Sequence, residues 1–126
     1  MVDLELTLPP DARSVRVARE ATRQGLDHFP SECVEIAAAI VSELVSNAIR
    51  HGSPPISLHV VPKPSRIKIS VTDASSSAPV VKSASPLDQQ GRGLEIVEAL
   101  SDRWGVTTGD AGKSVWCELD VLPALR

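Results

Sequence analysis

Three polar side chains recur at every fourth position between residues 42 and 52, namely Glu43, Asn47 and His51. On a helix this spacing places all three on one face. The apolar residues between them lie beside that face and can be buried. A polar stripe on an otherwise apolar helix is stable only where it lines a cleft or finds partners. The segment therefore predicts one wall of a binding site.

The residue types of this stripe suit a metal and an acid-base group. Asn47 offers a neutral carbonyl oxygen, which suits a small hard cation such as magnesium that keeps most of its waters and shares nucleotide phosphates as ligands. Glu43, one turn earlier, is a candidate general base on a water or hydroxyl near that metal. Alternatively, Glu43 and Asn47 only bond loop backbone, and His51 only closes the helix.

Two further features follow along the chain. Asp73 ends an alternating apolar run, where a carboxylate at the rim of a sheet can accept from an amino group such as that of adenine, or can simply form a turn. Gly91, Arg92 and Gly93 directly precede a predicted helix over 94–100. Bare amides at the positive end of a helix suit phosphate, although such glycines equally make a flexible joint. The order of these features favours one site.

Periodicity indicates the helices and strands on which these residues lie. Period-two alternation predicts strands, and apolar residues at helical spacing predict helices. The expected elements are a strand over 2–8, a helix from Asp11 to about Gly25, a long helix capped by Ser31 and ending at Gly52, a hairpin of 56–61 and 66–72, a loop over 74–92, a helix over 94–100, and a hairpin of 104–108 and 114–121. This order predicts a two-layer α+β sandwich, with a mixed, mostly antiparallel sheet and helices on one face.

Composition limits the class of protein. The 126 residues suit a single domain over 1–126, and a net charge of −3 with scattered Arg and Lys argues against direct binding of nucleic acid. No apolar run could span a membrane, and Asp3 and Glu5 stand where a secretion signal would be basic, so we expect a cytoplasmic protein. The isolated Cys33 and Cys117 favour buried free thiols over a disulfide or metal pair.

Taken together, these motifs resemble the ATP-binding domain of the GHKL class. Gyrase, the ninety-kilodalton heat-shock chaperones, histidine kinases and mismatch-repair ATPases share this domain. The greatest likeness is to the small, free-standing anti-sigma-factor serine kinases of bacteria, in the form common in actinobacteria. The motifs that carry the resemblance are residues 43–52, Asp73 with Pro79 after it, residues 91–100, Trp104-Gly105, and residues 112–119.

The resemblance implies a Bergerat-type fold with ATP and magnesium as cofactors. It implies that Asn47 holds magnesium, that Glu43 is the catalytic base, that Asp73 reads adenine, and that Gly91 and Gly93 let the chain wrap the phosphates. His51, Arg92 and Leu94 stand in the same motifs and are expected in the cofactor site.

The implied activity is that of a serine/threonine protein kinase. It would phosphorylate a small anti-sigma-factor antagonist, sequester a sigma factor as an anti-sigma factor, and form a homodimer.

Two departures from the family pattern bear on that activity. Ser75 stands where the family usually has a glycine two positions after the aspartate, and Lys113 stands where many relatives have a threonine. Both positions are expected near the adenine base. They keep open an alternative function, a non-catalytic nucleotide-sensing regulatory binding module.

Overall fold

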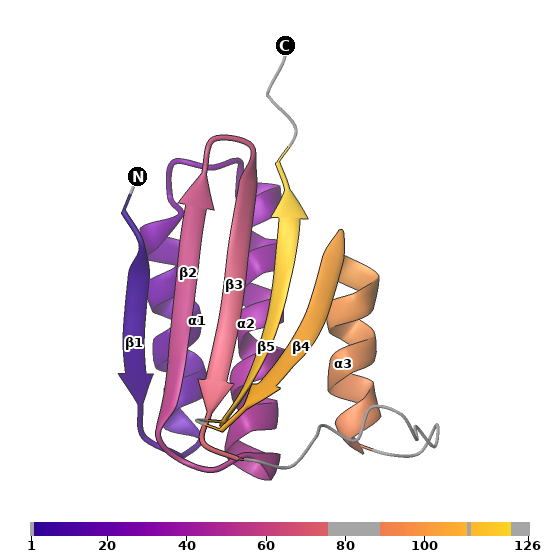
Figure 1. The fold of residues 1–126 in the computed structure, drawn as a ribbon. Coiled ribbons are helices and arrows are strands. Elements are labelled where there is room, and N and C mark those ends of the chain that lie inside the picture. Colours follow the sequence, from indigo (N-terminus) through magenta and orange to yellow (C-terminus); the bar gives the residue numbers. More distant parts are fainter. Residues whose placement is uncertain (1, 76–88, 111, 122–126) are drawn as a thin grey trace.

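The computed structural model describes residues 2–75, 89–110 and 112–121, except for the side chains of residues 89–93. In this part of the chain, helices and strands form one sheet with helices packed on it (Figure 1). Their bounds are β1 (Leu4–Leu8), α1 (Arg13–Gly25), α2 (Ser31–His51), β2 (Ile56–Lys63), β3 (Arg66–Asp73), α3 (Gln89–Leu100), β4 (Arg103–Gly109) and β5 (Gly112–Asp120).

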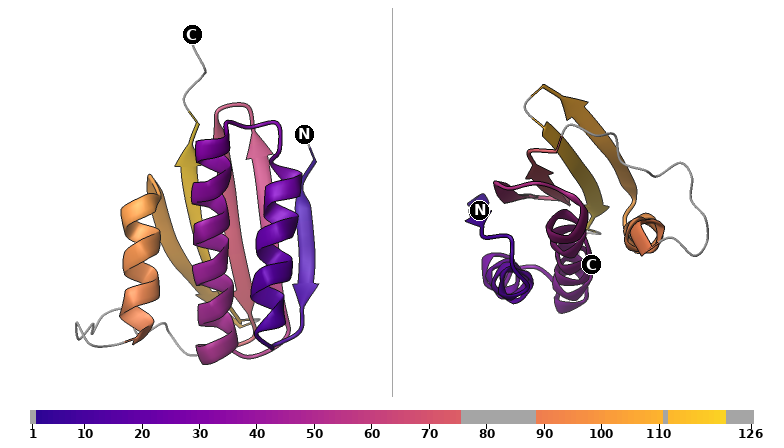
Figure 2. Two further views of the ribbon diagram at one scale, coloured as in Figure 1. Left: turned by 180° about the vertical axis from the view of Figure 1, so that it is seen from behind. Right: turned by 90° about the horizontal axis from the view of Figure 1, so that it is seen from below.

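The sheet has the strand order β1-β2-β3-β5-β4, and each neighbouring pair is antiparallel. Helices α1 and α2 cover one face of the sheet, and α3 lies alongside β4 (Figure 2). The predicted α+β sandwich with helices on one face is therefore confirmed.

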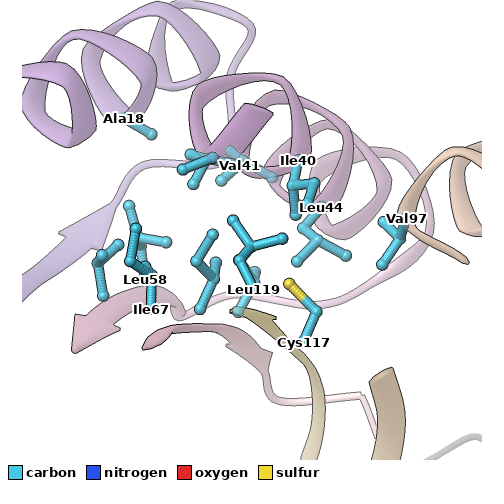
Figure 3. Packing of buried hydrophobic residues seen from close by; sticks show 14 of the residues in the cluster. Ala18, Ile40, Val41, Leu44, Leu58, Ile67, Val97, Cys117 and Leu119 are labelled. Carbon is cyan, nitrogen blue, oxygen red and sulfur yellow. The ribbon is translucent and has the colours of Figure 1, made fainter. Parts of the chain in front are cut away.

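The core lies between α2 and the middle of the sheet (Figure 3). Alternation along β3 buries Ile67, Ile69 and Val71 against the helices. From the facing side, α2 contributes Ile40 and Leu44, which are almost fully buried. Each such side chain stabilises the fold by about 1.5–3 kcal/mol relative to an exposed one. This packing fixes the rotation of α2 and hence the direction of its polar stripe.

The helix boundaries differ from the prediction in two places. Helix α3 begins at Gln89, five residues before the predicted start at Leu94, so Gly91 and Gly93 lie inside the helix. Contacts of α3 with α2 and β4 stabilise a helix that the two glycines would not favour alone. Pro30, not Ser31, is the N-cap of α2, and no side chain caps that end. Of the predicted loop over 74–92, residues 76–88 lie outside the described part.

The thiols follow the prediction in part, because both are free but Cys33 is only half-buried. Cys33 and Cys117 are both free, and Cys117 is fully buried in the core. Within the described residues, the helices are too short or too polar to cross a membrane.

Candidate functional site

The predicted site residues gather at one end of the molecule. The C-terminal end of α2, the last residues of β3, the turn between β4 and β5, and the first turn of α3 all lie there (Figures 1 and 2). A backbone hydrogen bond of 2.8 Å from Ala74 N–H to the Ser53 carbonyl ties the segment after α2 to the segment after β3. The fold thus brings α2 and Asp73 together across twenty residues of sequence.

The stripe on α2 runs toward this end. Glu43 and Asn47 are half-buried, whereas His51, the last residue of the helix, is exposed. Successive members of the stripe are separated by about 6 Å along the helix axis. Asn47 and, one turn farther from Asp73, Glu43 therefore border the residues at the helix end.

Asn47 carries an unusual oxygen. Its side-chain Oδ1 is buried and has no hydrogen-bond partner among the described residues. Leaving a buried acceptor unpaired costs about 1–3 kcal/mol. Such an atom fits a cation or another ligand that would supply the missing contact.

Asp73 ends β3 with only 3% of its side chain exposed. One carboxylate oxygen, Oδ1, accepts N–H donors from Ser75 at 2.7 Å and from Ser53 at 3.3 Å. These bonds hold the carboxylate in a fixed orientation. The second oxygen, Oδ2, accepts neither of them and can accept from a ligand.

Two glycines allow the backbone to approach Asp73 closely. A Cβ on Gly52 would lie 2.5 Å from both Cγ and Oδ2 of Asp73, and a Cβ on Gly112 would lie 2.1 Å from the Asp73 carbonyl oxygen. Gly112 also has a φ of +138°, which a residue with a side chain rarely adopts. The sequence predicts only that Gly52 ends the helix, because the contact of Gly52 with Asp73 depends on tertiary structure.

Lys113 lies opposite Asp73 in the β3–β5 register. Its Nζ is 3.8 Å from Asp73 Oδ2, and its side chain is only 12% exposed. The sequence marked Lys113 as a departure from the family pattern but could not show this pairing.

The glycine motif lies in the first half of α3. The backbone of Gly91, Arg92 and Gly93 is helical, and the Arg92 side chain lies outside the described part. Leu94 is buried, with 8% exposed, and Val97 one turn later is fully buried. These apolar contacts hold α3 beside α2, so the start of α3 lies at the same end of the molecule as Asp73 (Figure 2).

The chemistry of this cluster suits a nucleotide better than a metal held by protein alone. Among the described residues, no group of three or more His, Cys, Asp or Glu could hold a metal ion. A single buried amide oxygen does fit magnesium that is held mainly by phosphates and waters. The Asp73 carboxylate oxygen, which is held in a fixed orientation at a distance from Asn47, fits the amino group of a nucleobase.

The family follows from a match over nearly the whole chain. The model of the histidine kinase-like ATPase domain matches residues 8–119. This chain belongs to the histidine kinase-like ATPase domain family. Membership implies that the domain binds ATP and is kinase-like. No curated protein matches this histidine kinase-like ATPase domain by sequence.

Solved structures share the fold of this histidine kinase-like ATPase domain. The RsbU and RsbW domains of Rv1364c from Mycobacterium tuberculosis match it with a TM-score of 0.75 and 19% identity, over 96% of this chain and 32% of that one. The histidine kinase domain of the blue-light activated histidine kinase EL346 from Erythrobacter litoralis matches with a TM-score of 0.55 and 20% identity, over 73% of this chain and 46% of that one. This chain thus spans about a third to a half of the length of these relatives.

Proposed function

We propose that this chain is an ATP- and magnesium-dependent protein serine kinase. In our proposal it phosphorylates a small anti-sigma-factor antagonist and, as an anti-sigma factor, sequesters a sigma factor. The observation that best supports the nucleotide site is the buried Oδ1 of Asn47, which has no hydrogen-bond partner among the described residues. Asn47 lies one helical turn from Glu43, which is half-buried. Motifs that resemble the anti-sigma-factor serine kinases support the choice of substrate and partner.

Each residue has one role in this proposal. Asn47 would hold magnesium through Oδ1, and the metal would offset charge on the phosphates of ATP. Asp73 would accept from the adenine amine through Oδ2, and the backbone amide of Gly91, in the first turn of α3, would contact the phosphates. The amide of Gly93 lies past that turn and bonds within the helix, so Gly93 would contribute only by leaving room for the phosphates. The nucleobase and the phosphates lie at opposite ends of a nucleotide. Gly52, which touches Asp73, lies about 7.5 Å along α2 from Asn47. This offset fits one bound nucleotide with its base at Asp73 and its phosphates near Asn47.

Phosphotransfer then needs one base and good alignment. The serine oxygen of the antagonist forms a bond to the γ-phosphorus while the bond from that phosphorus to the bridging oxygen of ADP breaks. Glu43 takes the proton of the serine hydroxyl, and ADP leaves with the electron pair of the broken bond. Most of the acceleration comes from positioning and charge stabilisation.

The partners follow from the same resemblance. In Rv1364c an RsbU domain shares the chain with the RsbW domain, which supports a regulatory role that involves other proteins. We further propose that the chain acts as a cytoplasmic homodimer. Light scattering coupled to gel filtration tests the dimer, and a monomer at micromolar concentration would contradict it.

Transfer of labelled γ-phosphate from ATP to a candidate antagonist tests the kinase. Glu43→Ala should abolish transfer and leave ATP affinity unchanged, since Glu43 acts on the hydroxyl and not on the nucleotide. Glu20→Ala, an exposed acid on α1, is the matched control and should transfer phosphate normally. Full phosphate transfer by Glu43→Ala would show that Glu43 is not the catalytic base.

One observation favours a second candidate, a nucleotide-sensing binding module without catalysis. The ammonium of Lys113 lies 3.8 Å from Asp73 Oδ2, the oxygen that would accept from the adenine amine. Such a module would bind ATP and change its protein partner, but would neither release nor transfer phosphate. The same labelled-phosphate assay separates the two functions.

A further inference from the structure

The proposed kinase mechanism gives Lys113 no role, although its side chain lies beside the Asp73 carboxylate. Lys113 is the second residue of β5 and pairs with Asp73 across the β3–β5 ladder. Cys117 and Leu119 are buried on the helix-covered face of β5, and Lys113 shares their face because side chains alternate along a strand. Its ammonium is thus turned toward the proposed base site, on the same side of the sheet as the Asp73 carboxylate.

The contact between Lys113 and Asp73 is loose. The distance of 3.8 Å from Nζ to Oδ2 is too long for a hydrogen bond, although it permits charge attraction. Lys113 donates no hydrogen bond to residues 2–75, 89–110 or 112–121, yet it is only 12% exposed. An ammonium is a donor with three N–H groups and no acceptor capacity. Its donors can therefore still bond a ligand that enters beside Oδ2.

Together the two groups present a hydrogen-bond acceptor beside a hydrogen-bond donor. Asp73 Oδ2 accepts only, because a carboxylate oxygen carries no hydrogen. The backbone N–H groups of Ser53 and Ser75 bond Oδ1, which leaves Oδ2 for a ligand. Lys113 Nζ donates only. The edge of adenine offers the complement, since its exocyclic amine donates and the adjacent ring nitrogen N1 accepts. Guanine offers O6 as an acceptor and N1–H as a donor, so in the same orientation both contacts are repulsive.

We propose that Lys113 is a base-specificity residue that donates to N1 of adenine while Asp73 accepts from the exocyclic amine. This inference rests on the proposed function, because it places ATP in this site. A threonine hydroxyl at the same position could donate or accept, whereas an ammonium can only donate. Lys113 therefore makes the pocket more selective against guanine than a threonine would.

The test is a cycle of two ligands and two proteins. ATP and 1-deaza-ATP, which lacks the N1 acceptor, are titrated by calorimetry into the natural chain and into Lys113→Met, which keeps an unbranched apolar side chain. The natural chain should bind ATP about tenfold more tightly than the 1-deaza analogue. Lys113→Met should bind both equally. Lys68→Met is the matched control, since Lys68 lies over Trp116 on the other face of the sheet, and it should keep the full ratio.

The same titrations with GTP and with Lys113→Thr test selectivity. The preference of the natural chain for ATP over GTP should fall in Lys113→Thr and Lys113→Met. If the natural chain binds ATP and 1-deaza-ATP equally, or Lys113→Met keeps the ratio, the inference is wrong while the proposed ATP site stands. If the natural chain binds none of these nucleotides, the proposed function fails and the inference fails with it.

Discussion

Replacing Gly52 with alanine adds one methyl group against the Asp73 carboxylate. The new Cβ would lie 2.5 Å from Cγ and Oδ2 of Asp73 and 2.8 Å from the Ala48 carbonyl oxygen. The backbone itself tolerates alanine, because Gly52 has φ −97° and ψ −165°, an extended conformation. The effect of the substitution is therefore steric and falls on the carboxylate.

The size of the effect follows from these distances. Ordinary contact begins at 3.4 Å, so the carboxylate and the Cβ must separate by about 0.9 Å (3.4 minus 2.5). A shift of that size is enough to break the 3.3 Å bond from Ser53 N–H and to move Oδ2 away from a bound base. Loss of one hydrogen bond to a charged group corresponds to about 1.5–3 kcal/mol, or about 10- to 150-fold weaker ATP binding. Overpacking also lowers the free energy of unfolding by about 1–3 kcal/mol.

Calorimetric titration with magnesium-ATP and urea unfolding together measure both effects. Gly25→Ala is the matched control, because a Cβ at Gly25 would meet nothing within 4 Å, and it should bind ATP as the natural chain does. If folded Gly52→Ala bound ATP with unchanged affinity, the Asp73 carboxylate would not read the base from the observed position.

Three further predictions concern the stability and the thiols of the fold. Arg103 donates a hydrogen bond of 2.7 Å to Glu118 and lowers the pKa of that carboxyl. The resulting stabilisation is present above the ordinary glutamate pKa near 4 and is lost as the pH falls through the lowered pKa. Arg103→Met should therefore shift the urea midpoint at pH 7 more than at pH 3, and an equal shift at both values would contradict the ion pair. Burial raises the pKa of the Cys117 thiol to about 12, so Ellman's reagent should titrate Cys117 only in denaturant; rapid labelling of both thiols in the native chain would show that Cys117 is accessible. Ile69 is fully buried in the middle of the sheet, and Ile69→Ala should lower the free energy of unfolding by about 2–5 kcal/mol, which urea titration would show; a loss below 1 kcal/mol would mean that the core there is loosely packed.

Local patterns were enough to predict most of the fold. Alternation along 56–61 and 66–72 located β2 and β3, because each strand buries one face, and helical spacing up to Gly52 located α2. The start of α3 was wrong because it depends on contacts with α2 and β4, which override the low helix propensity of Gly91 and Gly93.

The site was only partly predictable for the same reason. Glu43, Asn47 and His51 share a helix face, and their spacing shows this directly. The contacts around Asp73 are different, because they join α2, β3 and β5 across long stretches of sequence. The approach of Gly52 and the position of Lys113 beside Oδ2 depend on strand register and helix placement, which no local pattern encodes.

The magnesium dependence of ATP binding is the most direct test of the proposed nucleotide site. Calorimetric titration with ATP, with and without magnesium, is made on the natural chain and on Asn47→Ala, which removes the buried Oδ1. We expect magnesium to strengthen ATP binding to the natural chain, and we expect this gain to be lost in folded Asn47→Ala. Binding that is the same with and without magnesium, or the same in both proteins, would contradict the proposed nucleotide site.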